Sequence, residues 1–257
     1  MEMILKQKKT GQIHWFQFIF MWSTFLILTI FFGMIASISS IFFLLNSNGN
    51  RTHSIATLWA KSILYCNPWW TFKITGTENL PTSDEPVIYV VNHQSQADIL
   101  AIYLINTNFR WLAKASLFKI PIVGWGMSSA KYVPVKRNDP HSREKCLKLS
   151  AAHLKNKTSM LFFPEGTRSP DGVLRKFKGG AFRLAKQMNV AIVPITIQGC
   201  STLLPKGSML PNYTNVEIYI HKKISQEQYS AEELMNHSRD IIASALPEAL
   251  RGKKYEN

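Results

Sequence analysis

Beyond about residue 60, the chain alternates between short apolar stretches and longer stretches in which apolar residues recur every three or four positions. Short apolar stretches bounded by turn-forming residues are typical of buried strands, and the longer period is that of a helix. Strands that alternate with helices predict an α/β fold whose sheet is covered by helices. The predicted strands are 70–74, 87–91, 110–113, 132–135, 160–163, 191–197 and 216–220. The predicted helices are 98–105, 143–155, 181–188 and 231–246.

A different pattern precedes this region, because residues 15–45 contain no charged side chain. One straight helix of that length would be about 46 Å long, whereas the hydrocarbon core of a bilayer is about 30 Å thick. Two geometries fit: a single tilted membrane span, or a helical hairpin that dips into one leaflet and returns. Gly33 lies in the middle of this segment, and basic residues flank the segment on both sides. These features favour the hairpin with both ends cytoplasmic. An apolar run this long exceeds what a buried helix of a soluble protein needs.

Composition narrows the partners that this chain can have. Thirty Lys and Arg residues face 16 Asp and Glu, a formal net charge of +14, which favours a nucleic acid or an anionic membrane surface. No helix-turn-helix, zinc-finger or aromatic RNA-binding signature is present, and the long apolar segment suits lipid. The three cysteines are scattered without a CxxC pair, which argues against a disulfide framework and a zinc site.

Five positions separate His93 from Asp98 in the stretch VNHQSQADIL, between two apolar runs. In one regular helix these side chains would not share a face, since five residues turn the chain by about 500°. They can meet if His93 lies in the loop after strand 87–91 and Asp98 in the first turn of the next helix. One interpretation is structural: Ser95 begins the helix and Asp98 completes a capping box. The other is chemical: neutral His93 takes a proton from a hydroxyl while Asp98 fixes its tautomer.

The stretch LFFPEGTRSP has the same layout, an apolar strand followed by a polar loop. Gly166 lets the backbone approach a ligand closely, and Arg168 offers a planar guanidinium that suits phosphate. Lys114 and Arg137 also stand near the ends of predicted strands. Each basic residue alone is more typical of a solvated surface. Together they predict an anion site, because α/β proteins collect ligand-binding groups in the loops at strand ends.

Four sequence blocks, in order, resemble those of the glycerolipid acyltransferase family. The first, similar to that family's His-x4-Asp motif, is NHQSQAD, and the second is KASLFKIPIVGWGMSSAKYVPVKR. The third and fourth are FFPEGTRS and VPITIQG. The resemblance covers roughly residues 70–200 and is strongest to bacterial-type 1-acylglycerol-3-phosphate acyltransferases. It implies a mixed, mostly parallel sheet flanked by helices, preceded by a membrane-associated helix or helical hairpin.

The same resemblance implies roles for individual residues. His93 would be the general base that deprotonates the 2-hydroxyl of lysophosphatidic acid, and Asp98 would orient it. The alkoxide would attack the thioester of acyl-CoA or acyl-carrier protein directly, with no metal and no cofactor. Pro194 would shape the fourth block near the acyl chain, while the oxyanion donor would be a backbone N–H of the first or fourth block. The residues implied in acceptor binding are Lys114, Arg137, Glu165, Gly166, Thr167 and Arg168.

We therefore expect residues 1–60 to anchor the chain to the inner (cytoplasmic) membrane and residues 61–257 to form an acyltransferase domain facing the cytoplasm. The expected partners are membrane lipids, lysophosphatidic acid and an acyl thioester, with no nucleic acid. Other acceptors share the four blocks: another lysophospholipid, glycerol-3-phosphate or lyso-ornithine lipid. A serine-type lipid hydrolase would need an exposed nucleophile, and the GxSxG motif is absent. A non-catalytic, membrane-anchored basic protein is a further alternative.

Overall fold

One mixed sheet organises the protein. The computed structural model describes residues 15–42, 48–82, 85–136, 138–169, 171–205 and 207–253. Its strands are β1 (Trp70–Thr75), β2 (Ile88–Val91), β3 (Phe109–Lys114), β4 (Val133–Val135), β5 (Ser159–Phe162), β6 (Ile192–Gln198) and β7 (Thr214–Ile220). Within the described residues they form a seven-stranded sheet in the order β1-β7-β6-β2-β5-β3-β4. Only the β6–β7 pair among these strands is antiparallel, so the predicted mixed, mostly parallel sheet is confirmed.

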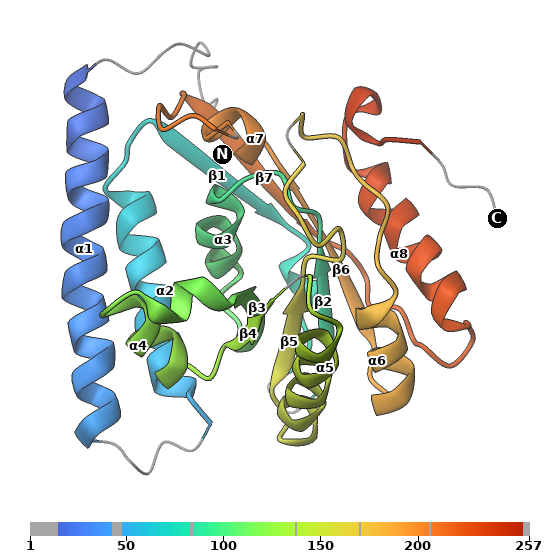
Figure 1. Cartoon of the computed structure of the whole chain (residues 1–257). Coiled ribbons are helices and arrows are strands. Elements are labelled where there is room, and N and C mark those ends of the chain that lie inside the picture. The colour runs from blue at the N-terminus through green and yellow to red at the C-terminus, as the bar shows by residue number, and fades with distance from the viewer. Residues whose placement is uncertain are drawn as a thin grey trace.

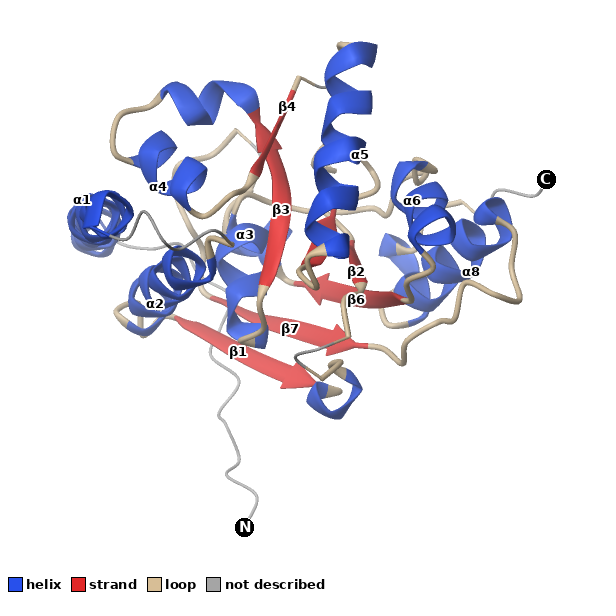
Figure 2. Cartoon of the chain, turned by 90° about the horizontal axis from the view of Figure 1, so that it is seen from below, coloured by secondary structure: helices blue, strands red, loops and turns tan. Residues whose placement is uncertain are grey.

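Helices cover both faces of the sheet (Figures 1 and 2). They are α1 (Trp15–Phe42), α2 (Asn50–Tyr65), α3 (Ala97–Ile102), α4 (Val123–Ser129), α5 (Pro140–Lys155), α6 (Gly180–Met188), α7 (Cys200–Leu203) and α8 (Ala231–Ser244). Short 3-10 turns lie at Thr77–Asn79, Tyr103–Ile105, Ala115–Lys119 and Glu248–Leu250. Helices α1 to α4 lie on one side of the sheet, and α5, α6 and α8 lie on the other.

The alternation of side chains along each strand builds two separate cores. On β2, Tyr89 and Val91 pack into the core under α1 to α4, whereas Ile88 and Val90 pack into the core under α5, α6 and α8. All four side chains are fully buried. The central strands β2, β5 and β6 are buried on both faces and read as apolar runs, whereas β1 and β7 alternate between more and less buried positions. The sequence pattern located all seven of the strands described above.

The uncharged N-terminal segment forms one long helix. Helix α1 runs without interruption from Trp15 to Phe42, so the favoured hairpin within residues 15–45 is wrong. Gly33 does not break the helix; it gives room to a neighbour, because a β-carbon there would overlap the side chain of Ile122. The stretch Trp15–Ile38 is long and apolar enough to cross a membrane.

Helix α1 pairs with α2, a helix that the sequence pattern did not predict. The indole nitrogen of Trp59 donates a hydrogen bond to Thr29 Oγ1 at 3.0 Å, and the Trp59 ring meets Phe25 edge to face. Helix α2 begins in the polar stretch 46–52, and several of its residues are β-branched, so tertiary packing outweighs its weak intrinsic propensity. The expected division at residue 60 falls inside this helix.

Candidate active site

His93 and Asp98 meet at the carboxyl end of β2. His93 lies in the loop that follows the strand, and Asp98 lies in the first turn of α3. The distance from His93 Nδ1 to Asp98 Oδ2 is 2.8 Å, and Asp98 is fully buried. This is the loop-and-helix arrangement under which the five-residue spacing allows the two side chains to touch.

One oxygen of Asp98 performs both of the functions considered for this residue. Besides the imidazole, Asp98 Oδ2 accepts hydrogen bonds from the backbone N–H groups of Gln94 and Ser95, each at 2.7 Å. The bond from Ser95 is half of the predicted capping box. The other half is missing, because the Ser95 hydroxyl accepts from the backbone N–H of Ala97 at 3.3 Å instead of that of Asp98, while it donates to the carbonyl of Leu204 at 2.7 Å. The capping and orienting interpretations of Asp98 are therefore compatible.

The imidazole ring of His93 packs against an aromatic ring on one face, and one of its two nitrogens is available to a substrate. Phe163 stacks on it, with ring centroids 4.2 Å apart and planes 25° apart. In the neutral imidazole, an Nδ1–H that donates to Asp98 leaves the lone pair on Nε2. Nε2 has no hydrogen-bond partner among the described residues. The backbone is fixed too: His93 N donates to Glu165 Oε1 at 2.6 Å, and His93 O accepts from Ser169 N at 2.9 Å.

Buried amides tie this loop to its neighbours. The Asn92 side chain accepts from Ile197 N and donates to Ile197 O, both at 2.8 Å, which fixes the loop to β6. Gln94 Nε2 donates to the carbonyl of Gly172 at 3.1 Å. Sequence reasoning did not single out Asn92 or Gln94 as positioning residues. The available signal was two amide side chains that flank a histidine directly after a buried strand.

Glu165 faces the protein backbone. Its side chain is 4% exposed, and its oxygens accept from the backbone N–H groups of His93 at 2.6 Å and Arg175 at 3.1 Å. Burial raises the pKa of Glu165 to about 7, against the opposing effect of these two hydrogen bonds. The sequence analysis expected this carboxylate to bind the acceptor. Both of its oxygens instead bind backbone N–H groups, so Glu165 links the loop of His93 to the segment that leads to α6.

The basic residues predicted to bind phosphate lie at the same edge of the sheet. Lys114 ends β3 and is exposed. In the loop after β5, Thr167 is exposed and Arg168 is half-buried, and Gly166 has a φ of +72°, a conformation that favours glycine. Strands β2, β5 and β3 are parallel neighbours, so their carboxyl ends lie side by side. Arg137 lies outside the described residues.

Pro194 stands apart from this cluster. It lies inside β6 opposite Val90, and it is buried. It shares a strand face with Ile192, whose side chain packs into the core under α5, α6 and α8. The structure therefore does not bring Pro194 together with the apolar cavities on the other face of the sheet.

The backbone N–H groups expected to supply the oxyanion donor are largely occupied. Those of His93, Gln94 and Ser95 are each bound by a carboxylate. The N–H of Ile197, in the fourth block, donates to Asn92. None of these four groups is free to stabilise an oxyanion in this arrangement.

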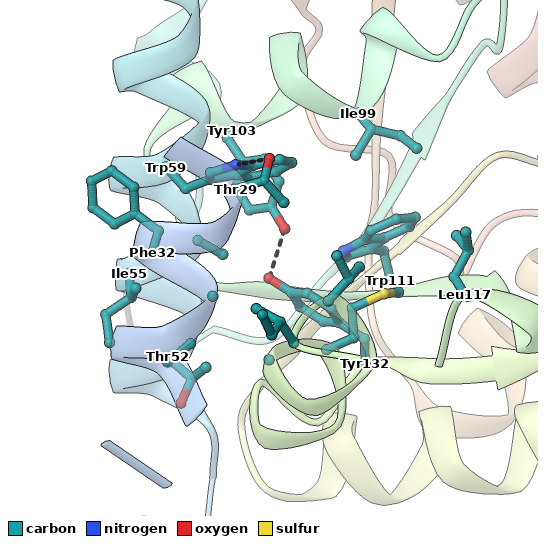
Figure 3. A pocket seen from close by; sticks show the side chains of 17 residues that line it. Thr29, Phe32, Thr52, Ile55, Trp59, Ile99, Tyr103, Trp111, Leu117 and Tyr132 are labelled. Carbon is teal, nitrogen blue, oxygen red and sulfur yellow. Dashed lines mark hydrogen bonds between the residues drawn. The ribbon is translucent and has the colours of Figure 1, made fainter. Parts of the chain in front are cut away.

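Two apolar cavities lie between the sheet and helices α1 and α2. One measures about 210 Å³ and reaches α4, and the other measures about 350 Å³ and reaches α3 and α7. Both are lined by Trp59, Ile99 and Leu117, and Ile99 directly follows Asp98 in the chain. Figure 3 shows the smaller one.

The two tyrosine hydroxyls in the wall of the smaller cavity are paired with each other. The hydroxyls of Tyr103 and Tyr132 are 2.7 Å apart (Figure 3). Tyr132 also bonds Nδ1 of His53, which lies behind the wall, at 2.9 Å. Burial raises the pKa of Tyr103 to about 12, and burial together with nearby Arg110 lowers the pKa of His53 to about 3. The wall therefore stays uncharged, which suits a hydrocarbon chain.

Within the described part of the chain, no three His, Cys, Asp or Glu side chains gather as metal ligands would. The free cysteines found there are Cys66, Cys146 and Cys200. Cys200 is fully buried, and burial beside Asp98 raises the pKa of its thiol well above the ordinary value. Burial and a raised pKa make it a poor nucleophile.

The arrangement is suited to activating a hydroxyl without a covalent intermediate. It offers an imidazole with an open Nε2, a buried carboxylate behind it, cationic groups on the neighbouring loops and apolar cavities that begin at Ile99. A base–orienter pair of this kind needs only a hydroxyl and an electrophile to complete the reaction.

Comparison with known proteins identifies one family. Residues 71–198 match the family model described as Acyltransferase. A chloroplastic 1-acyl-sn-glycerol-3-phosphate acyltransferase from Arabidopsis thaliana is 45% identical over 195 residues, 76% of this chain and 54% of that protein. A 1-acyl-sn-glycerol-3-phosphate acyltransferase from Chlamydomonas reinhardtii is 36% identical over 240 residues, 92% of this chain and 71% of that protein. The chain thus spans about half the length of the Arabidopsis relative.

A solved structure agrees with these relatives. The crystal structure of the 1-acyl-sn-glycerophosphate (LPA) acyltransferase PlsC from Thermotoga maritima matches with a TM-score of 0.67 and 28% sequence identity. The match covers 92% of this chain and 100% of that one, so it includes the helical N-terminal part as well as the sheet. The chain belongs to the glycerolipid acyltransferase family that contains the 1-acyl-sn-glycerol-3-phosphate acyltransferases.

Proposed function

We propose that this protein transfers a fatty acyl group from an acyl thioester to the 2-hydroxyl of 1-acyl-sn-glycerol-3-phosphate, which makes phosphatidic acid for phospholipid synthesis. The observation that carries the proposal is the His93–Asp98 pair with its open Nε2. Lys114 and Arg168 stand at the same edge of the sheet, and Ile99, the residue after Asp98, lines both apolar cavities. The names of the similar proteins from three organisms support the same reaction.

The chemistry needs one base and no covalent enzyme intermediate. His93 Nε2 takes the proton of the acceptor hydroxyl as its oxygen attacks the thioester carbonyl, and Asp98 stabilises the imidazolium that forms. The tetrahedral intermediate collapses with loss of the thiolate, which takes the proton back from His93. The products are a new ester and a free thiol. No cofactor takes part, and the acyl donor is a substrate.

The structure disfavours the hydrolase alternative at its most obvious nucleophile. Ser95 is the serine nearest to His93 in the sequence, but its hydroxyl donates to Leu204 O at 2.7 Å and it begins the turn into α3. A serine nucleophile would have to present its oxygen to Nε2. Accumulation of an acyl-enzyme would overturn direct transfer.

A phosphate-bearing acceptor fits the charges at the carboxyl edge of the sheet. We assign its phosphate to Lys114 and Arg168, with Arg137 as a further partner and the Gly166–Thr167 backbone alongside. Guanidinium and ammonium groups are the usual partners of phosphate. Glycerol-3-phosphate and other lysophospholipids would satisfy the same charges, so they remain the alternative acceptors.

The fatty acyl chains of the two substrates fit the two apolar cavities described above. The cavities lined by Trp59, Ile99 and Leu117 begin one residue from Asp98, and we assign the fatty acyl chains to them. The depth available there would set the preferred chain length.

We propose that α1 holds the enzyme in the inner (cytoplasmic) membrane, with the acyltransferase domain facing the cytoplasm. Many of its large apolar side chains, including Trp15, Phe16 and Ile27, are more than half exposed. The net charge of +14 suits an anionic membrane surface. Deleting residues 1–45 should release the protein from membrane fractions, and undiminished membrane binding would contradict the anchoring role.

The proposed reaction is tested by mass spectrometry of the products of the purified full-length chain. The acceptors are lysophosphatidic acid, glycerol-3-phosphate and lyso-ornithine lipid, each offered with acyl-CoA and with acyl-carrier protein. We expect phosphatidic acid from the first acceptor. Acylation of only another acceptor would keep the mechanism and replace the substrate, and transfer to none would contradict the proposal.

A further inference from the structure

A basic groove lies on the sheet face that α1 and α2 do not cover. It measures about 440 Å³ and lies between α5 and α6, over the carboxyl ends of β3 and β5. Its floor is apolar and includes Leu112, Val135 and Leu147. This groove belongs to neither of the two cavities assigned to acyl chains.

Three cations line the groove, and no acidic side chain does: Arg143 of α5, Lys178 before α6 and Arg183 of α6. The ion pairs within the described residues are His93–Asp98, Lys148–Glu144 and Lys223–Glu85, so none of the three cations takes part in one. An uncompensated cluster of this kind inside a concavity attracts an anion.

The backbone adds to the positive character of the groove. Gly179 and Gly180 begin α6 and line the groove, and no side chain caps this helix end. The backbone N–H groups of the first helical turn therefore have no side-chain acceptor. A β-carbon on Gly179 would lie 2.9 Å from Arg183 Nη1, so the guanidinium lies directly over the helix start.

The groove adjoins the candidate active site through one aromatic ring and one loop. Phe163 stacks on His93 and also lines the groove. Lys178 lies over the loop after β5: its backbone N–H donates to Pro164 O at 2.9 Å, and a β-carbon on Gly166 would lie 2.7 Å from its Nζ. A ligand bound in the groove would thus contact the Phe163 ring that stacks on the histidine and the loop that follows β5.

We propose that this groove binds a phosphate group of the acyl donor's carrier, a phosphopantetheine-type thiol, on the basis of the acyl transfer proposed above. The donor joins a hydrocarbon chain to a water-soluble, anionic carrier, and the two parts need different surroundings. The apolar cavities lie toward α1, whereas the basic groove lies on the opposite face. The floor of the groove receives the uncharged part of the carrier and the cations receive its phosphate.

The test compares two donors that differ by one phosphate: S-acyl-pantetheine and S-acyl-4′-phosphopantetheine. The full-length chain is assayed in anionic phospholipid micelles with lysophosphatidic acid as acceptor. Wild type should show a kcat/KM about tenfold to a hundredfold higher for the phosphorylated donor, the scale expected for charge-assisted hydrogen bonds. The double variant Lys178→Met, Arg183→Met should lose most of this preference and keep its acceptor KM.

Lys145→Met removes one exposed charge from α5 outside the groove and should keep the preference. Equal use of both donors by wild type would overturn the inference, as would a preference unchanged in the double variant. A rise in acceptor KM instead would place the acceptor's phosphate in the groove and also overturn it. Absence of transfer by wild type from any donor would instead refute the proposed reaction. Unfolding midpoints matched to wild type ensure that the variants are folded.

Discussion

Replacing Asp98 by asparagine separates the two functions of this side chain. In wild type, Asp98 Oδ2 accepts from His93 Nδ1 at 2.8 Å and from the N–H groups of Gln94 and Ser95 at 2.7 Å each. Asparagine can place its carbonyl oxygen at the same point and keep all three contacts. It cannot supply the negative charge that stabilises the imidazolium.

We expect Asp98→Asn to lower kcat by about a thousandfold, which corresponds to about 4 kcal/mol of transition-state stabilisation. Asp98→Ala should do the same and also destabilise the fold. It leaves two buried backbone N–H groups, of Gln94 and Ser95, without an acceptor, at about 1–3 kcal/mol each. The expected loss of stability is therefore about 2–6 kcal/mol for alanine and much smaller for asparagine.

The assay measures kcat for phosphatidic acid formation at saturating substrates, together with the thermal unfolding midpoint in detergent. Asp240→Asn, an exposed carboxylate of α8, serves as the control and should change neither quantity. If Asp98→Asn kept kcat within tenfold of wild type at an unchanged midpoint, the charge of Asp98 would have no part in catalysis and the capping interpretation alone would stand.

Three other perturbations test separate parts of the structure. Glu165→Ala should lower kcat at least about tenfold with little change in acceptor KM, because the carboxylate holds the backbone of His93; a large rise in acceptor KM would support acceptor binding instead. His53, whose pKa burial lowers to about 3, stabilises the fold above its ordinary pKa of about 6.5, and this stability is lost as the pH falls below that value. The unfolding midpoint should therefore fall between pH 6.5 and 5, and less so in His53→Gln; identical slopes would contradict this. Ala56→Phe fills part of the 210 Å³ cavity and should shift donor preference toward shorter acyl chains, and an unchanged chain-length profile would exclude this cavity as an acyl site.

The sheet was predictable from the sequence because its central strands β2, β5 and β6 are buried on both faces, and because β1 and β7 keep the alternation typical of a strand. The short helices α4 and α7 and the longer α2 were not predicted, since packing rather than periodicity stabilises them. The hairpin prediction failed at Gly33, which has the composition of a helix break but packs against Ile122 in a continuous helix. A glycine has the same appearance in the sequence whether it breaks a helix or makes room for a neighbour.

The histidine–aspartate contact was predictable because it is local, five residues across one strand-to-helix loop. The direction of Glu165 was not, because a sequence does not say whether a carboxylate points to solvent or to a backbone amide 72 positions away. The basic groove was not predictable for the same reason. Arg143 and Arg183 belong to different helices, and only the fold brings them together.

The measurement that tests the central claim most directly is phosphatidic acid formation by wild type and His93→Ala, with acceptor binding measured in parallel. His141→Ala, an exposed histidine at the start of α5, is the matched control. Loss of the base at Nε2 should lower acyl transfer by at least about a hundredfold while acceptor binding persists, and the control should remain active. A His93→Ala variant as active as wild type would contradict the assignment of this histidine as the general base.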